Sequence, residues 1–284
     1  MTTKQINEAI EETESMRMIT EAFTEISSSK LKQIRATVER NRLFFDDLTN
    51  IYGLVNLLAV HKGVPLPIKN NKTLSVVITS NYRFYGKVNN DLMNFFLVQT
   101  SKINSEKIVI GRTGIEFLKG INYALSFQSV ILEKDFPSEA ELRSLGELVA
   151  KYAKVLIFHP KFKSVLIQQS VITDVTQTKE NIDTKMNESK EQLDNYLHFI
   201  LEPELPIIVN FFDAQIKTLL LEQTFLETEL ARTAARLMTM DSAQNEAKNT
   251  LKQQKISLSH AKKSITNSRI LETIAALKLT RSQF

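Results

Sequence analysis

The chain has 284 residues, a hydrophobic fraction of 43% and a formal net charge of +4, values that are typical of a folded protein and exclude disorder of the whole chain. Its basic residues are interspersed with acidic ones, whereas a nucleic-acid-binding protein usually clusters them, so no nucleic-acid partner is expected. The absence of cysteine excludes disulfides and thiolate metal sites and favours a reducing compartment, the cytoplasm.

The two ends of the chain lack both glycine and proline. All seven glycines and all six prolines lie between Gly53 and Pro206. These residues disfavour a helix interior by about 1 and about 3 kcal/mol relative to alanine. Their absence predicts two long terminal helices, and we place the corresponding coiled-coil segments at residues 1–62 and 207–284.

The membrane is not expected to be crossed by this chain. No apolar run reaches the roughly 20 residues that a membrane span requires. The N-terminus is acidic rather than basic, unlike a signal or transit peptide. The chain is therefore predicted to be soluble, or to be held at a membrane only by partners.

Apolar residues of both ends follow the spacing of a coiled coil, with steps of four and three in the C-terminal stretch. Two such stripes predict an antiparallel two-helix coiled coil, and a helical bundle with a folded-back C-terminus is the alternative. The C-terminal seam consists of Phe212, Ile216, Leu219, Gln223, Leu226, Leu230, Thr233, Leu237, Met240, Gln244, Ala247, Leu251, Gln254, Leu258, Ala261 and Ile265. The N-terminal stripe consists of Met16, Ile19, Phe23, Ile26, Ile34, Val38, Phe45 and Leu48.

The middle of the chain alternates between strand and helix patterns. This alternation predicts a central Rossmann-like α/β domain over residues 73–200. The last two strands are expected to be antiparallel across a turn at Pro160, and the polar residues 174–190 are expected to form a mobile loop. The predicted strands are residues 73–80, 106–111, 154–158 and 164–173, and the predicted helices are residues 87–100 and 138–152, the second with a Ser138 cap.

The chain shows no positive sign of catalysis or of a bound cofactor. The first strand-to-helix turn, residues 80–87, has one glycine among bulky side chains, so a phosphate cradle is not expected there. Gly111 and Gly114 are better explained by turn geometry. The four histidines lack the spacing of metal ligands, which predicts surface or loop positions and no metal. The chain is therefore predicted not to be an enzyme.

Two sequence motifs resemble those of a known family. Residues 18–31, MITEAFTEISSSKL, are similar to the pattern K-I-T-x-A-M-x-x-V-A-x-x-K-L, and residues 234–243, AARLMTMDSA, are similar to A-A-R-M-x-A-M-D-x-A. Ser80, Gly86 and Asn89 match the family's S-D-x-G-L-C-G-G-x-N turn. On these motifs the chain resembles the gamma subunit of F-type ATP synthases, and the resemblance extends over nearly its whole length.

The resemblance implies a noncatalytic rotor shaft inside a ring of alternating alpha and beta ATPase subunits. The α/β domain would then meet an epsilon-like subunit and a membrane rotor ring, or a specialised adaptor. It implies a complex on the cytoplasmic side of a bacterial plasma membrane. The residues expected to contact the ring are Phe23, Lys30, Arg232, Arg236, Met240, Asp241, Lys262, Lys263 and Arg269.

The chain also departs from the family pattern. In the turn after the first strand, Asn81, Arg83, Tyr85 and Lys87 replace an aspartate, two glycines and a cysteine. Such changes would suit a gamma-like shaft of a specialised motor that drives other mechanical work, as in mycoplasma gliding. Two further hypotheses stay open at this point: a nucleotide-binding α/β protein with helical dimerisation arms, and a coiled-coil scaffold.

Overall fold

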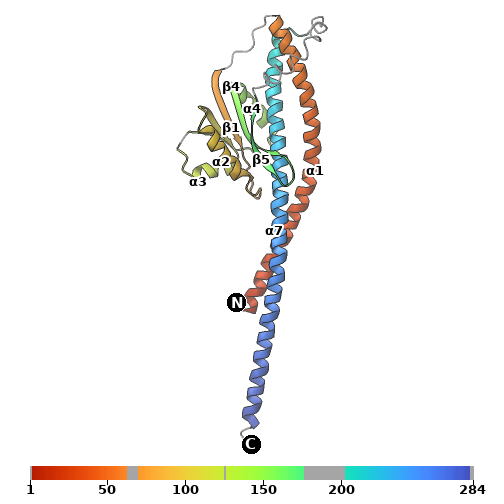
Figure 1. The fold of residues 1–284 in the computed structure, drawn as a ribbon, viewed down its shortest axis with the longest axis vertical. Helices are drawn as coiled ribbons and strands as arrows, with labels where there is room; N and C mark the ends of the chain where they lie inside the picture. Colours follow the sequence, from red (N-terminus) through yellow and green to blue (C-terminus); the bar gives the residue numbers. More distant parts are fainter. Residues whose placement is uncertain (1, 63–69, 125, 176–201, 282–284) are drawn as a thin grey trace. The chain divides into compact units, whose positions relative to one another are not determined.

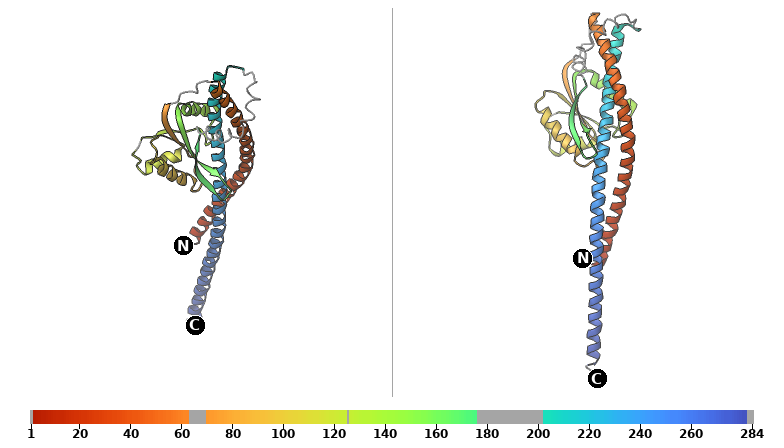
Figure 2. Two further views of the ribbon diagram at one scale, coloured as in Figure 1. Left: turned by 45° about the horizontal axis from the view of Figure 1, so that its top comes forward. Right: turned by 45° about the vertical axis from the view of Figure 1, so that its right-hand side comes forward.

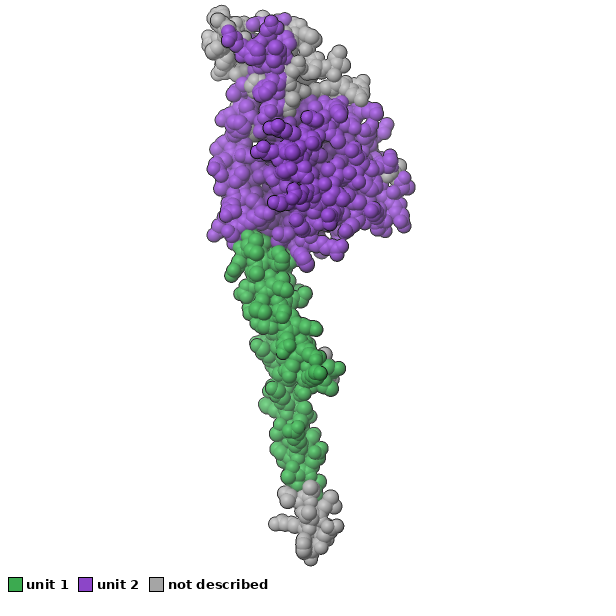
Figure 3. Space-filling view, turned by 180° about the vertical axis from the view of Figure 1, so that it is seen from behind, with its two compact units in different colours: residues 1–27, 237–284 green, residues 28–236 purple. Residues whose placement is uncertain are grey.

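The structure is a computed structural model that describes residues 2–62, 70–124, 126–175 and 202–281 (Figure 1). It forms two compact units: unit 1 contains residues 1–27 and 237–284, and unit 2 contains residues 28–236 (Figure 3). Both long helices contribute to each unit, so the units are described one at a time.

The terminal helices are α1, Thr3–His61, and α7, Leu205–Arg281. The prediction of two long helices from the distribution of glycine and proline is thus confirmed. Gly53 lies inside α1 without ending it. Pro206 lies in the first turn of α7, where its missing N–H would have no partner within the helix.

A five-stranded sheet in the order β3-β2-β1-β4-β5 lies at the centre of unit 2. The first four strands are parallel, and β5 is antiparallel to β4, as predicted. Because β1 lies between β2 and β4, the chain reverses its direction of winding at β1. The strands are β1, Asn70–Ile78; β2, Glu106–Ile110; β3, Gln128–Val130; β4, Tyr152–Phe162; and β5, Gln168–Asp174.

Helices cover both faces of this sheet (Figure 2). Helices α2, Val88–Thr100, and α3, Arg112–Gly120, pack on one face, where Phe96 meets Phe158 edge-on at 5.0 Å between ring centroids. Helix α4, Glu139–Ala150, and part of α7 pack on the other face. The sheet is therefore doubly wound, which confirms the predicted Rossmann-like α/β class. Ser138 caps α4 in a full capping box with Glu141.

The turn predicted at Pro160 is wrong, and two short elements were not predicted. Pro160 lies within β4 rather than in a turn, because the pairing of β1 with β4 ends at Phe158 and the missing proline N–H removes no bond to β1. The hairpin turn lies further on, where the Ile167 N–H donates to Ser164 O at 3.2 Å. Helix α3 and strand β3 were not predicted. In the predicted mobile loop, residues 176–190 lie outside the described residues.

Unit 1 is a pair of antiparallel helices. On α7 the buried side chains of Met240, Gln244, Ala247 and Leu251 follow steps of four and three, so the predicted seam is confirmed there. Across the pair, Gln254 Nε2 donates to Thr13 Oγ1 at 3.1 Å. The seam ends earlier than predicted, since all residues from 262 to 275 are exposed, including Ile265 at 43%.

The predicted stripe on the unit 1 part of α1 is wrong. Met16, Ile19 and Ile26 are 64%, 57% and 58% exposed. The buried positions are instead Ile6, Thr20 and Ser27, which fall on a seven-residue spacing. At Thr20 and Ser27 small polar side chains thus line the seam on α1, while Met16, Ile19 and Ile26 face outward.

In unit 2, α1 and α7 also pair in antiparallel fashion. Val55, Leu58 and Ala59 of α1 pack with Leu205 and Val209 of α7. Two ion pairs join the same helices further along. The first is Arg42 Nη2 with Glu227 Oε1 at 2.8 Å, and the second is Lys30 Nζ with Glu229 Oε1. Apolar contacts and charge pairs together hold α1 on α7 in this unit.

Candidate functional site

The carboxyl end of β1 is the first place to look for a site, because doubly wound sheets bind ligands where the winding reverses. Here the turn at residues 80–87 is bonded to its own surroundings. The Asn81 N–H donates to Asp135 Oδ1 at 2.6 Å, and Asn81 Nδ2 donates to Leu132 O at 2.7 Å. Asn89 Nδ2 donates to Ser80 Oγ at 2.8 Å. Asn81, Asn89 and Ser80 of this turn are therefore already engaged within the chain.

Two glycines in the next turn serve geometry, as predicted for Gly111. Its φ is 99°, and a Cβ at this position would lie 2.4 Å from Thr79 O. Gly114 lies in the first turn of α3, where its N–H donates to Thr79 Oγ1 at 3.0 Å. A Cβ on Gly114 would lie 2.7 Å from the same oxygen. Both glycines allow α3 to approach the end of β1 closely.

Two side chains from helix α7 close this edge of the sheet. Arg232 is fully buried, and its Nη2 donates to Ile78 O at 3.0 Å. The Arg236 guanidinium lies 4.2 Å from the ring centroid of Tyr85. The Tyr85 hydroxyl donates to Asp135 Oδ2 at 2.5 Å. Burial and this hydrogen bond raise the pKa of Tyr85 far above its usual value, so its phenol stays neutral.

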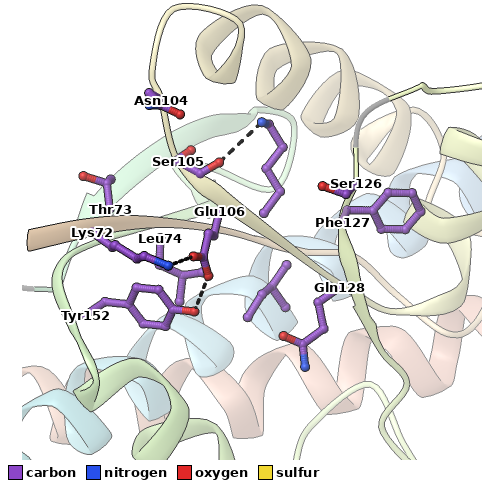
Figure 4. A pocket seen from close by; sticks show the side chains of 12 residues that line it. Lys72, Thr73, Leu74, Asn104, Ser105, Glu106, Ser126, Phe127, Gln128 and Tyr152 are labelled. Atoms are coloured by element: carbon purple, nitrogen blue, oxygen red, sulfur yellow. Dashed lines mark hydrogen bonds and ion pairs between the residues drawn. The ribbon is translucent and has the colours of Figure 1, made fainter. Parts of the chain in front are cut away.

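The opposite edge of the sheet carries an open cavity of about 710 Å³ (Figure 4). Lys72, Glu106, Gln128 and Tyr152, one from each parallel strand, line it together with the loops before β2 and β3. Lys72 Nζ lies 2.8 Å from Glu106 Oε1, and the Tyr152 hydroxyl donates to Glu106 Oε2 at 2.6 Å. Sequence analysis missed this cavity because its residues are spread over strand starts that are far apart in the chain.

The chemistry of this cavity does not suit proton transfer. Hydrogen bonds from Lys72 and Tyr152 lower the pKa of Glu106 below its ordinary value. The bond to Glu106, together with partial burial, raises the pKa of Tyr152. A general acid or base works best with a pKa near neutral pH, and both shifts lead away from it.

Two absences concern the described residues only. No three His, Cys, Asp or Glu side chains come together there to hold a metal ion. Nor does any helix within the described ranges combine the length and apolarity that a bilayer span needs.

The prediction of surface or loop histidines is wrong for His159. This residue lies on β4 and is 1% exposed, with Nε2 2.8 Å from Thr173 Oγ1. Burial lowers its pKa to about 4.

The structure separates the residues predicted to contact a partner into two groups. Asp241, Lys262, Lys263 and Arg269 are exposed in unit 1, and Phe23 is half-buried there. Lys262 and Lys263 line a shallow recess with Lys255. Lys30 is exposed in unit 2 although it pairs with Glu229, and Arg236 is half-buried against Tyr85. Met240 and Arg232 are 5% and 0% exposed, which leaves neither side chain a free surface.

Large apolar side chains are exposed on both helices of unit 1. On α1 these are Met16, Met18, Ile19 and Ile26. On α7 they are Ile256, Ile265, Ile270, Leu271 and Ile274, each between 43% and 66% exposed. Exposed apolar side chains in such numbers on one unit indicate a surface that a partner covers.

These features define the class of the protein: two long antiparallel helices with a doubly wound α/β domain between them in the sequence, and helix surfaces suited to partner contacts. A family model described as ATP synthase matches residues 2–278. The chain belongs to the gamma-subunit family of the ATP synthases.

Individual relatives agree with this assignment. The ATP synthase gamma chain of Lachnoclostridium phytofermentans is 24% identical over 278 residues, covering 93% of this chain and 94% of the relative. That of Clostridium botulinum strain Langeland is 24% identical over 291 residues, covering 97% of each. Among solved structures, a central stalk chain of the Tetrahymena thermophila mitochondrial ATP synthase is similar with a TM-score of 0.56 at 19% identity, covering 79% of this chain and 99% of that chain. This last likeness shows a shared fold.

Proposed function

We propose that this chain is the central rotor shaft of an F-type rotary ATPase. In this role the gamma subunit is structural, and catalysis takes place on the beta subunits of a ring of alternating alpha and beta subunits. The observation that supports this role best is the inverted pattern of α1 in unit 1. Small polar Thr20 and Ser27 are buried in the seam, while Met16, Ile19 and Ile26 face outward. A surrounding apolar collar would account for that pattern.

The charged residues of unit 1 suit contacts that must form and break as the shaft turns. Exposed ion pairs contribute only about 0.2–1 kcal/mol each, so each contact with the ring would break readily as the shaft turns. Arg232 and Met240 are left out of the proposed contact set because both side chains are buried within the chain. The proposed contact residues are Phe23, Lys30, Arg236, Asp241, Lys262, Lys263 and Arg269.

The remaining parts of the chain follow from the same role. We propose a coiled-coil segment at residues 1–62, an α/β domain at residues 73–200 and a second coiled-coil segment at residues 207–284. The α/β domain would meet an epsilon-like subunit and a membrane rotor ring, or a specialised adaptor in their place. The complex would lie on the cytoplasmic side of a bacterial plasma membrane.

A reversible crosslink tests the rotor role. The chain has no cysteine of its own, so Lys262→Cys can be joined to one cysteine placed on the facing ring subunit of the purified complex. Oxidation is expected to stop ATP hydrolysis, and reduction is expected to restore it. In the matched control, Lys102→Cys on the α/β domain, oxidation is expected to leave hydrolysis unchanged. Full hydrolysis by a complex with a complete crosslink would contradict the role, as would ATP turnover by the isolated chain.

A nucleotide-binding α/β protein is the competing hypothesis, and titration separates the two. The groups at the carboxyl end of β1 are bonded to Asp135, Leu132 and Ser80. Calorimetric titration of the isolated chain with ATP or ADP is therefore expected to give no heat of binding. A stoichiometric binding isotherm that is lost on replacement of residues 80–87 would favour the competing hypothesis.

A further inference from the structure

The most deeply buried charged side chain of the described residues is Arg232, at the carboxyl end of β1. It is 0% exposed, and its Nη2 donates to the carbonyl of Ile78, the last residue of that strand. Nε and Nη1 make no hydrogen bond within the described part of the chain. The acidic groups that act on its charge are Asp135 and Glu229. The guanidinium thus lies at the carboxyl end of β1, the end of the sheet at which doubly wound domains bind ligands.

Residues of α7 that precede and follow Arg232 also make polar contacts, some with the α/β domain and some with α1. One helical turn further on, Arg236 stacks on Tyr85, which is bonded to Asp135. On the side toward α1, Glu227 pairs with Arg42 and Glu229 pairs with Lys30. Residues 227–236 of α7 are therefore the segment at which α1, α7 and the loops of the α/β domain are all joined by polar contacts.

A buried arginine is a poor way to gain stability. Removing a charge from water is costly, and apolar side chains of similar volume often stabilise a core as well or better. What a guanidinium adds is direction, because the Nη2 donor of Arg232 must point at the Ile78 carbonyl to keep its hydrogen bond. The apolar contacts of Leu221 and Phe225 with Leu145 and Val149 hold the layers together, but apolar contacts are not directional. Arg232 can fix both the rotation of α7 and its position along the sheet.

We propose that Arg232 is the positioning residue that locks helix α7 to the α/β domain in a single register, so that torque passes between the two without slip. This inference rests on the proposed rotor function and adds to it the residue at which torque leaves the helix. It also gives a mechanical use to the sheet edge that other doubly wound domains use for ligands.

The test compares variants in the assembled complex, with a bead attached through a biotin-acceptor peptide inserted after Lys102 on the α/β domain. The ring is held in its pause, and the angular spread of the bead reports how stiffly the domain follows the helix. Arg232→Met is expected to widen the spread while ATP hydrolysis stays unchanged. Arg232→Lys, which keeps the charge and loses the planar donors, is expected to widen it less. Arg143→Met, on the exposed face of α4, is the control and is expected to change nothing.

A disulfide staple provides the rescue. A Cβ built on Gly146 of α4 would lie 3.7 Å from Thr218 Cβ on α7, within the range of about 3.5–4.5 Å that a disulfide needs. Gly146→Cys with Thr218→Cys is expected to restore the narrow spread of Arg232→Met under oxidation and to lose it again on reduction. If Arg232→Met does not fold, the same oxidation and reduction comparison in Arg232→Lys decides.

The outcomes separate this inference from the proposed function. A wild-type complex that neither assembles nor rotates would count against the rotor role itself. A wild-type complex that rotates, together with an Arg232→Met complex of unchanged angular spread, would overturn the locking role alone. A spread that stays wide after the staple has formed would overturn it as well, because the lost stiffness would then lie elsewhere.

Discussion

The outward-facing apolar residues of α1 give the sharpest prediction about the collar. In a triple variant, Met16, Ile19 and Ile26 are each replaced by glutamine, which a helix accepts as readily. Their exposed fractions are 64%, 57% and 58%. Full burial of such a side chain contributes about 1.5–3 kcal/mol, so covering the remaining three-fifths contributes about 1–2 kcal/mol each. The free energy with which the triple variant binds the ring of alpha and beta subunits should therefore be weaker by about 3–5 kcal/mol, which is a loss of roughly a hundredfold to several thousandfold in affinity.

The assay measures how much chain is needed to give half-maximal ATP hydrolysis by alpha and beta subunits, alongside the thermal melting of the chain alone. Melting should be unchanged, because exposed substitutions usually alter stability by less than about 0.5 kcal/mol. The matched control is Val98→Gln on α2, which is 57% exposed but lies on the α/β domain, and its half-maximal concentration should stay at the wild-type value. An unchanged half-maximal concentration for the triple variant would refute the collar argument, and so would a large fall in its melting temperature.

Three further predictions concern the chain itself. The pKa of buried His159 is about 4 against 6.5 in the unfolded chain, so the unfolded state binds more protons between these values. The contribution of His159 to the free energy of unfolding should be fully present above pH 6.5 and be lost as the pH drops toward 4, by at most about 3 kcal/mol. Urea titrations at a series of pH values measure this free energy, and in His159→Gln this part of its pH dependence should be missing. Gly111→Ala should lower the free energy of unfolding by about 1–3 kcal/mol from its strained backbone alone. The control is Gly120→Ala, whose Cβ would meet nothing within 4 Å and which should be neutral or slightly stabilising in the same titrations. Equal losses in the two variants would contradict the argument. Leu230→Asp, at a 3% exposed position, should lose about 3 kcal/mol or more in circular dichroism melting, and Leu237→Asp, at a half-buried one, should lose less.

Local chemistry made much of the fold predictable. The long helices follow from the distribution of glycine and proline, and the start of α4 follows from the Ser138 cap. Strand β3 escaped prediction because three residues show no usable alternation. Helix α3 escaped because its nine residues include two glycines. Pro160 was misplaced because its tolerance depends on where the neighbouring strand stops pairing, which no local pattern records.

The candidate site was less predictable, for a physical reason. An apolar stripe shows that side chains avoid water, but not whether they are covered by the same chain or by another. Met16, Ile19 and Ile26 were therefore assigned to the wrong surface. The seven-residue spacing of Thr13, Thr20 and Ser27 is the signal that marks the true seam. Arg232 looked like any other basic residue of a helix, since only the packing of α7 on the sheet buries it.

The stretch of α7 that lies beyond the seam has a consequence for how the protein assembles. From residue 262 to residue 275 every side chain of α7 is exposed, so no neighbouring helix supports these turns. Helical turns without tertiary support are only marginally stable in water. The free subunit should therefore exchange its amide hydrogens fastest in this stretch and become protected there only when other subunits enclose it. Assembly with the other subunits would then complete the folding of α7, and an unassembled subunit would expose these marginally stable helical turns to cellular proteases.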